Sequence, residues 1–234
     1  RMLSLKPRLG PPFYPYEFVD QEFALAVEQR GPRSVLHLSA EAPHYPGLVL
    51  HEEIALSAGG QGTLTLYLEN HGNEVRLLNL GLAAGTGDRD ALTVVVPLHE
   101  GVVRTPNGQY PAADQDAPRD PSAYAEPWFA WEKRGAVGGV SWGDQVRVVD
   151  LAWHPRLDAA PLRAAPGERS APVQYGFFVG SGDWQTARRA LLGDHAPTTA
   201  PRLRRPLEAR VEPAVLATVR DTATARLIVD SLSR

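Results

Sequence analysis

Alternation of apolar and polar residues at every second position is the feature that most constrains the fold of this 234-residue chain. Between Thr63 and Glu69, leucines at positions 64, 66 and 68 alternate with polar or amphipathic residues. This period of two is typical of a strand with one face on a core and the other toward solvent. Similar runs recur along the chain, and 21 glycines and 21 prolines supply turns between them. The pattern predicts an all-β protein.

Two segments depart from simple alternation. Residues 92–98 form a continuous apolar run, which predicts a strand covered on both faces. Asp183 is a good helix N-cap, and apolar residues follow it at helical spacing as far as Gly193. Many strands with one short helix predict a large antiparallel two-sheet sandwich. The residues Asn70–Asn73 predict a β-hairpin, and residues 104–123 and 155–171 predict long loops.

The domain organisation follows from a change in composition after residue 193. Residues 194–206 combine three prolines with small polar and basic residues, as linkers do, and three strand-like runs follow. We therefore expect a sandwich domain over residues 1–193 that begins with a proline- and aromatic-rich arm. We expect a linker over 194–206 and the first strands of an immunoglobulin-like β-sandwich over 207–234. The chain begins with Arg1 and ends with Arg234, which indicates a fragment of a longer polypeptide.

Composition excludes several classes of function. The chain has no cysteine, so disulfides and cysteine-based metal sites are excluded. The formal net charge is −3 and no basic face is evident, so we expect no nucleic-acid partner. No apolar run approaches about 18 residues, so we expect no membrane span.

Four of the five tryptophans lie between Tyr124 and His154. Aromatic rings beside carboxylates suit a sugar, because rings pack on its C–H faces and carboxylates accept from its hydroxyls. Packing in the core is the alternative. Since two residues three apart on a strand face opposite sides, we expect one of Trp128 and Trp131 to be buried and the other half exposed. The candidate ligand-binding residues are Tyr124, Glu126, Trp128, Trp131, Trp142, Asp144 and Trp153.

A candidate cation site lies in the loop before the tryptophans. Asp114, Asp116 and Asp120 place carboxylates at alternating positions, loosely as a calcium loop does. They lack the glycine and the final glutamate of an EF-hand, so a solvated loop is the alternative. Calcium is the one cofactor that we consider, and the sequence otherwise predicts none.

Residues 46–82 resemble the early strands of galactose-mutarotase-like β-super-sandwich domains. The charged pair Glu52-Glu53, the turn at Gly59-Gly60 and the Asn70-His71-Gly72 motif come in the order of those domains. The VPLHEG segment at 96–101 is similar to the strand that follows, and the resemblance extends loosely over residues 20–193. It implies a large super-sandwich.

The resemblance implies two alternative roles. In aldose epimerases this fold is catalytic, with a histidine acid and a glutamate base that act on a sugar. His99 matches the histidine position, although Glu100 follows it where the family has proline. Glu126 and Glu132 are the candidate bases, but neither lies in a matching motif. In glycoside hydrolases and lyases the fold is an ancillary domain, and the lack of a clean acid–base pair favours this second role.

Three functions therefore stay open. The sequence favours a non-catalytic module for carbohydrate-related binding or scaffolding in a larger, secreted or envelope-associated protein. Its partners would be carbohydrate or other domains of the same polypeptide. The alternatives are a mutarotase-like enzyme that uses His99 and a glutamate, and a structural or protein-interaction module.

Overall fold

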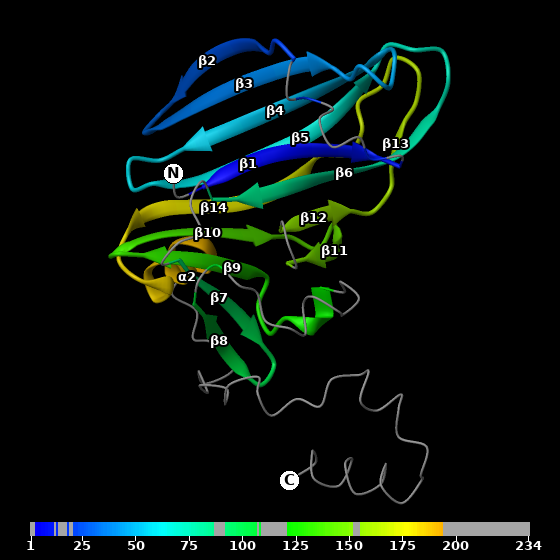
Figure 1. The fold of residues 1–234 in the computed structure, drawn as a ribbon. Helices are drawn as coiled ribbons and strands as arrows, with labels where there is room; N and C mark the ends of the chain where they lie inside the picture. Colours follow the sequence, from blue (N-terminus) through cyan, green and yellow to red (C-terminus); the bar gives the residue numbers. More distant parts are fainter. Residues whose placement is uncertain are drawn as a thin grey trace, which may run out of the picture. The chain divides into compact units, whose positions relative to one another are not determined.

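The computed structural model describes residues 3–11, 13, 18, 21–86, 92–106, 108, 121–151 and 155–193. Within these residues the fold consists of two antiparallel β-sheets and one short α-helix, so the predicted all-β sandwich is confirmed (Figure 1). The linker expected at 194–206 and the second domain expected at 207–234 lie outside the described residues. No helix in the described part of the chain is long and apolar enough to cross a bilayer.

The two sheets differ in width. The larger has nine strands in the spatial order β2 (Ala24–Arg30), β3 (Arg33–Glu41), β4 (Leu48–Leu56), β5 (Gln61–Asn70), β14 (Val173–Ser181), β10 (Ala136–Trp142), β9 (Trp128–Lys133), β7 (Thr93–Leu98) and β8 (Gly101–Thr105). The smaller has the order β1 (Ser4–Gly10), β6 (Arg76–Gly85), β12 (Arg156–Ala159) and β11 (Val146–Asp150), and β13 (Leu162–Ala164) also pairs with β6. A 3-10 turn, η1 (Pro121–Ala123), precedes β9, and helix α2 (Trp184–Leu192) follows β14.

The main core fills the space between the two sheets. On β5 the leucines at 64, 66 and 68 are fully buried, while the residues between them face outward, as their alternation predicts. Phe129, Trp131 and Tyr175 join this core from the larger sheet, and Leu80 and Leu82 from the smaller one. The core is thus built from the apolar positions of the period-two pattern.

A second, smaller core lies on the other face of the larger sheet, under α2. It contains Val95, Trp128, Val137 and Phe178 from the strands and Ala187 from the helix. The predicted helix is confirmed. The side chain of Asp183 accepts a hydrogen bond from the Thr186 backbone N–H at 3.0 Å, and Gly193 ends the helix with a φ of 82°.

One predicted turn and one predicted loop differ from the structure. The residues Asn70–Asn73 do not close a hairpin, because β5 and β6 belong to different sheets and the chain crosses between them here. The Asn70 side chain explains this, since its Nδ2 donates to the Ala164 and Glu74 carbonyls and its Oδ1 accepts from the Gly72 N–H. Residues 155–171 are not one loop, because β12 and β13 pair with β6 there, which adds tertiary contacts that local composition does not reveal.

A glycine on β6 makes room for an ion pair on the outer face of the smaller sheet. Arg8 on β1 and Asp158 on β12 both pair with Gly81, from opposite sides. Arg8 Nη1 donates to Oδ1 and Oδ2 of Asp158 at 2.8 and 3.0 Å across the bare backbone. A Cβ atom at position 81 would lie well inside van der Waals contact with Asp158 Oδ1.

We expect Gly81→Ala to lower the free energy of unfolding by about 1–3 kcal/mol, because the added methyl group must displace the Asp158 carboxylate. Gly85→Ala on the same strand is the matched control, since a Cβ there meets no atom within 4 Å. The control should stay within about 1 kcal/mol of the wild type. Urea unfolding measures both, and equal stability of the two variants would contradict this account of Gly81.

One carboxyl group lies on the inward face of the larger sheet. Glu52 on β4 is only 9% exposed and stands opposite Leu66 of β5 and Leu38 of β3 on the same face. Burial away from water raises the pKa of Glu52 from 4.5 to about 7, because the ionised form loses its hydration. Since the folded state holds this proton more tightly than the unfolded chain does, Glu52 lowers the stability as the pH rises from about 4.5 to about 7.

In the wild type, we expect Glu52 to lower the free energy of unfolding by an amount on the order of 3 kcal/mol between about pH 4.5 and about pH 8. Glu52→Gln should not show this decrease, because it has no carboxyl group to ionise. The variant should therefore be more stable than the wild type at the higher pH. Glu53→Gln serves as the control, because Glu53 faces the other side of the sheet and should leave the fall in place. Urea titrations at the two pH values decide it, and a wild-type fall that survives in Glu52→Gln would refute the assignment.

Candidate functional site

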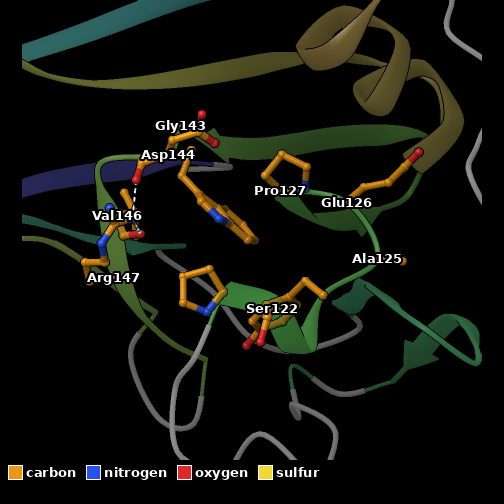
Figure 2. A pocket seen from close by; sticks show the side chains of 11 residues that line it. Ser122, Ala125, Glu126, Pro127, Gly143, Asp144, Val146 and Arg147 are labelled. Atoms are coloured by element: carbon orange, nitrogen blue, oxygen red, sulfur yellow. Dashed lines mark hydrogen bonds between the residues drawn. The ribbon is translucent and has the colours of Figure 1, made fainter.

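A pocket of about 560 Å³ lies beside Trp142, where η1 and the segment before β9 meet the turn between β10 and β11 (Figure 2). We call it the Trp142 pocket. It is lined by Pro121, Ser122, Tyr124, Ala125, Glu126, Pro127, Trp142, Gly143, Asp144, Val146 and Arg147. Its volume falls in the range of small-molecule sites.

Backbone hydrogen bonds hold the first wall of the pocket, residues 121–127, against the larger sheet. The Ala125 N–H donates to the Pro97 carbonyl at 2.9 Å, and the Trp142 N–H donates to the Pro127 carbonyl at 3.1 Å. An isolated bridge joins Tyr124 to Leu98. These bonds place the Tyr124 ring edge-on to Trp142, with the ring centroids 5.4 Å apart. The two rings line the pocket, but they also belong to the main core and are only 7% (Tyr124) and 6% (Trp142) exposed.

The turn between β10 and β11 supplies the second wall and its exposed charges. Arg147 Nη1 donates to the backbone carbonyls of Asp144 and Val146. These bonds fix the guanidinium at the rim, next to the exposed side chain of Asp144 (Figure 2). Among the described residues, no carboxylate forms an ion pair with Arg147. The rim therefore offers N–H donors and carboxylate acceptors to a ligand.

Glu126 belongs to both the pocket and the helix–sheet core. Its carboxylate accepts from Arg188 Nη2 at 2.6 Å and from Arg188 Nε at 2.7 Å, and it also accepts from Trp128 Nε1 at 2.7 Å. Glu126 and Arg188 are 9% and 6% exposed, so this is a buried ion pair. The hydrogen-bonded carboxylate raises the pKa of the Arg188 guanidinium above its ordinary value. Figure 2 shows the Glu126 side chain reaching toward α2.

The pocket unites four of the seven residues that we predicted for ligand binding. Tyr124, Glu126, Trp142 and Asp144 line it, whereas Trp153 lies outside the described residues. The sequence did not single out Arg147 or Ser122, because an arginine or serine in a turn carries no pattern of its own.

The expectation for Trp128 and Trp131 is wrong in one respect. The two rings do face opposite sides of β9, but both are buried, with exposures of 0% and 1%. Trp131 lies in the main core, while Trp128 stacks on Trp184 of α2 at a centroid distance of 5.8 Å. The helix covers the face that we expected to be open, so neither ring is available to a ligand.

The candidate catalytic residues form other contacts. His99 Nε2 lies 2.6 Å from the Ser122 carbonyl, which ties the turn after β7 to η1. The Glu132 carboxylate accepts from the Trp184 backbone N–H and from Arg104 Nη2, each at 2.6 Å. Glu132 therefore supports the first turn of α2. The aspartates proposed for calcium, Asp114, Asp116 and Asp120, lie outside the described residues.

We expect Arg188→Met to lower the free energy of unfolding by about 3–5 kcal/mol, because it leaves the Glu126 carboxylate buried without a cation. Arg189→Met is the matched control, since Arg189 is the next residue on α2 and its side chain is exposed. The control should change stability by no more than about 0.5 kcal/mol. Denaturant unfolding followed by tryptophan fluorescence measures both, and a mild effect of Arg188→Met would show that the pair is not structurally important.

Comparison with known proteins gives a fold but no family. No protein-family model matches the sequence, and no curated protein matches it. The fold is similar to that of the alpha-N-acetylgalactosaminidase NagBb from Bifidobacterium bifidum in its GalNAc complex, at 11% identity and a TM-score of 0.54, over 79% of this chain and 32% of that chain.

Two further structures are similar at lower scores. One is the GH36 alpha-galactosidase AgaA from Geobacillus stearothermophilus in complex with raffinose, at 15% identity and a TM-score of 0.49, over 81% of this chain and 29% of that chain. The other is the Slr1438 protein from Synechocystis sp. PCC 6803, at 13% identity and a TM-score of 0.44, over 68% and 66%. At 11% identity the likeness to NagBb shows the fold alone. This chain spans 32% of NagBb, 29% of AgaA and 66% of the Slr1438 protein.

Proposed function

We propose that residues 3–193 are a non-catalytic, carbohydrate-binding module of a larger secreted or envelope-associated protein, and that the Trp142 pocket is the binding site. The observation that carries this proposal is the composition of the pocket. Two largely buried aromatic side chains form one side, and the exposed side chains of Asp144 and Arg147 stand at the rim. Rings suit the C–H faces of a sugar, and charged donors and acceptors suit its hydroxyls.

A binding role fits the pocket better than catalysis. Of the two carboxylates that line it, Glu126 is held by Arg188 and Trp128, so its oxygens are already committed to the fold. Asp144 is exposed at the rim, and apart from Glu126 the described residues that line the pocket include no second carboxylate or histidine that could act with it as an acid or base. General acid–base chemistry on a sugar needs two groups within reach of the same substrate.

The setting in a larger protein rests on the fold comparison. The chain spans 32% of NagBb, an alpha-N-acetylgalactosaminidase whose structure contains GalNAc. We therefore propose two kinds of partner for this chain, which are a carbohydrate ligand and further domains of the same polypeptide.

We expect the full 234-residue chain to bind at least one glycan on an array. Arg147→Ala and Asp144→Ala should each weaken that binding about tenfold or more in calorimetry, because a hydrogen bond to a charged group contributes about 1.5–3 kcal/mol. Both side chains are exposed, so the fold should persist.

Arg163→Ala is the control for a lost surface arginine, since Arg163 is exposed on β13 and pairs with Glu168 away from the pocket lining. It should bind as the wild type does. The proposal fails if no glycan binds, or if the two pocket variants bind as tightly as Arg163→Ala.

A further inference from the structure

The inward face of the larger sheet becomes steadily more exposed toward its β2 edge. One row of directly paired residues runs across four strands, from Leu66 through Glu52 and Leu38 to Leu25. Leu66 is fully buried, Glu52 is 9% exposed, Leu38 is half-buried and Leu25 is 59% exposed. The smaller sheet therefore covers the inward face of the larger sheet at β5 but does not cover it at β2.

A second row shows the same gradient. It runs from Leu64, 1% exposed, through the half-buried Ile54 and Leu36 to Val27, 66% exposed. All seven residues of β2 are exposed. We use the term open face for the outer part of both rows, which consists of Leu25, Val27, Leu36, Leu38, Glu52 and Ile54. Leu25 and Val27 are exposed, and the half-buried Leu36, Leu38 and Ile54 connect them to the main core. A contiguous, partly exposed apolar surface of this kind marks an interaction surface.

Glu52 gives the open face a specific chemistry. Within the described residues, its carboxylate has no hydrogen-bond or ion-pair partner, and desolvation alone shifts its pKa. Buried carboxylates are normally paired or hydrogen-bonded, because losing water without compensation is costly. The adjacent Glu53 faces the other side of the sheet and lies 3.7 Å from His37. Of these two neighbouring carboxylates, only the unpaired one of Glu52 lies on the apolar, inward face of the larger sheet.

We propose that the open face is a docking site for an amphipathic protein segment that presents a lysine or arginine flanked by apolar side chains, with the cation paired to Glu52. An apolar segment without a cation would complete the desolvation of the carboxylate, whereas a cation would compensate it. This surface does not include any residue that lines the Trp142 pocket, so the inference does not depend on the proposed sugar site.

The partner must lie across the face and not only along the edge. Strands in a sheet are about 4.8 Å apart, so a strand added beyond β2 would lie about 14 Å from β4. That distance exceeds the reach of a lysine side chain within the plane of the sheet. A segment lying over β2 and β3 can instead contact Leu25 and Leu38 while its cation reaches Glu52.

The test uses n-octylammonium as the probe and n-octanol as its uncharged counterpart, with the full chain labelled for NMR. We expect both to shift amide signals of β2, β3 and β4, and the ammonium to bind about tenfold more tightly at about pH 8. Glu52→Gln should abolish that preference, while Glu53→Gln, which removes a charge from the opposite face, should retain it. Because a protonated carboxyl has no charge to pair, the preference in the wild type should also disappear at about pH 5.

The pH series needs no variant, so it decides the matter even if Glu52→Gln alters the fold. Equal affinity for the two probes in the wild type would overturn the proposal, as would a preference that persists in Glu52→Gln or at low pH. Signal changes that map outside β2–β4 would overturn it as well. None of these outcomes bears on glycan binding, which is measured separately at Arg147 and Asp144.

Discussion

The unequal width of the two sheets is the constraint on which the rest of this structure depends. A four-strand path with one extra short strand cannot cover a nine-stranded sheet, so apolar surface remains on the larger sheet. At the β9 end, α2 packs on the outer face and turns it into a second core. At the β2 edge no described element covers the inward face, and Leu25 and Val27 remain exposed. The mismatch in width thus accounts for the open face, whereas α2 covers apolar residues on the opposite face of the larger sheet.

The β9 strand joins the two cores. Trp131 faces inward and lies in the main core, while Trp128 faces outward and lies in the smaller core under α2. Gly139 makes room for the helix, because a Cβ there would lie 3.0 Å from Leu191. Gly176 makes room for Ser141 on the neighbouring strand β10, which a Cβ at position 176 would overlap. The buried pair of Glu126 and Arg188 then links the helix to the segment before β9.

Most of the strands and the helix could be predicted, because the residues that specify each of them lie next to one another in the sequence. The alternation on β5 and the cap at Asp183 each lie within a few residues, and the structure confirms both. The exposure of Trp128 could not be predicted, because it depends on Trp184, a residue more than fifty positions away. The strands between 156 and 164 form for a similar reason, since β6 provides their partner.

The candidate site was predicted in part. Tyr124, Trp142 and Asp144 could be named from the clustering of aromatic residues and carboxylates, and the structure does place them around one pocket. Arg147 was missed because its importance comes from the turn that fixes its guanidinium and not from any spacing in the sequence. Glu126 was named for the wrong reason, since its carboxylate is directed to Arg188 and not to a ligand.

The double role of Glu126 has a consequence for how this pocket can diverge. A substitution at Glu126 must be matched at Arg188 on another element, so two simultaneous changes are needed on that wall. The turn that carries Asp144 and Arg147 has no such tie, because both side chains are exposed. Single substitutions in this turn can therefore change the rim of the pocket without disturbing the core, whereas a change at Glu126 also breaks the contact with the helix.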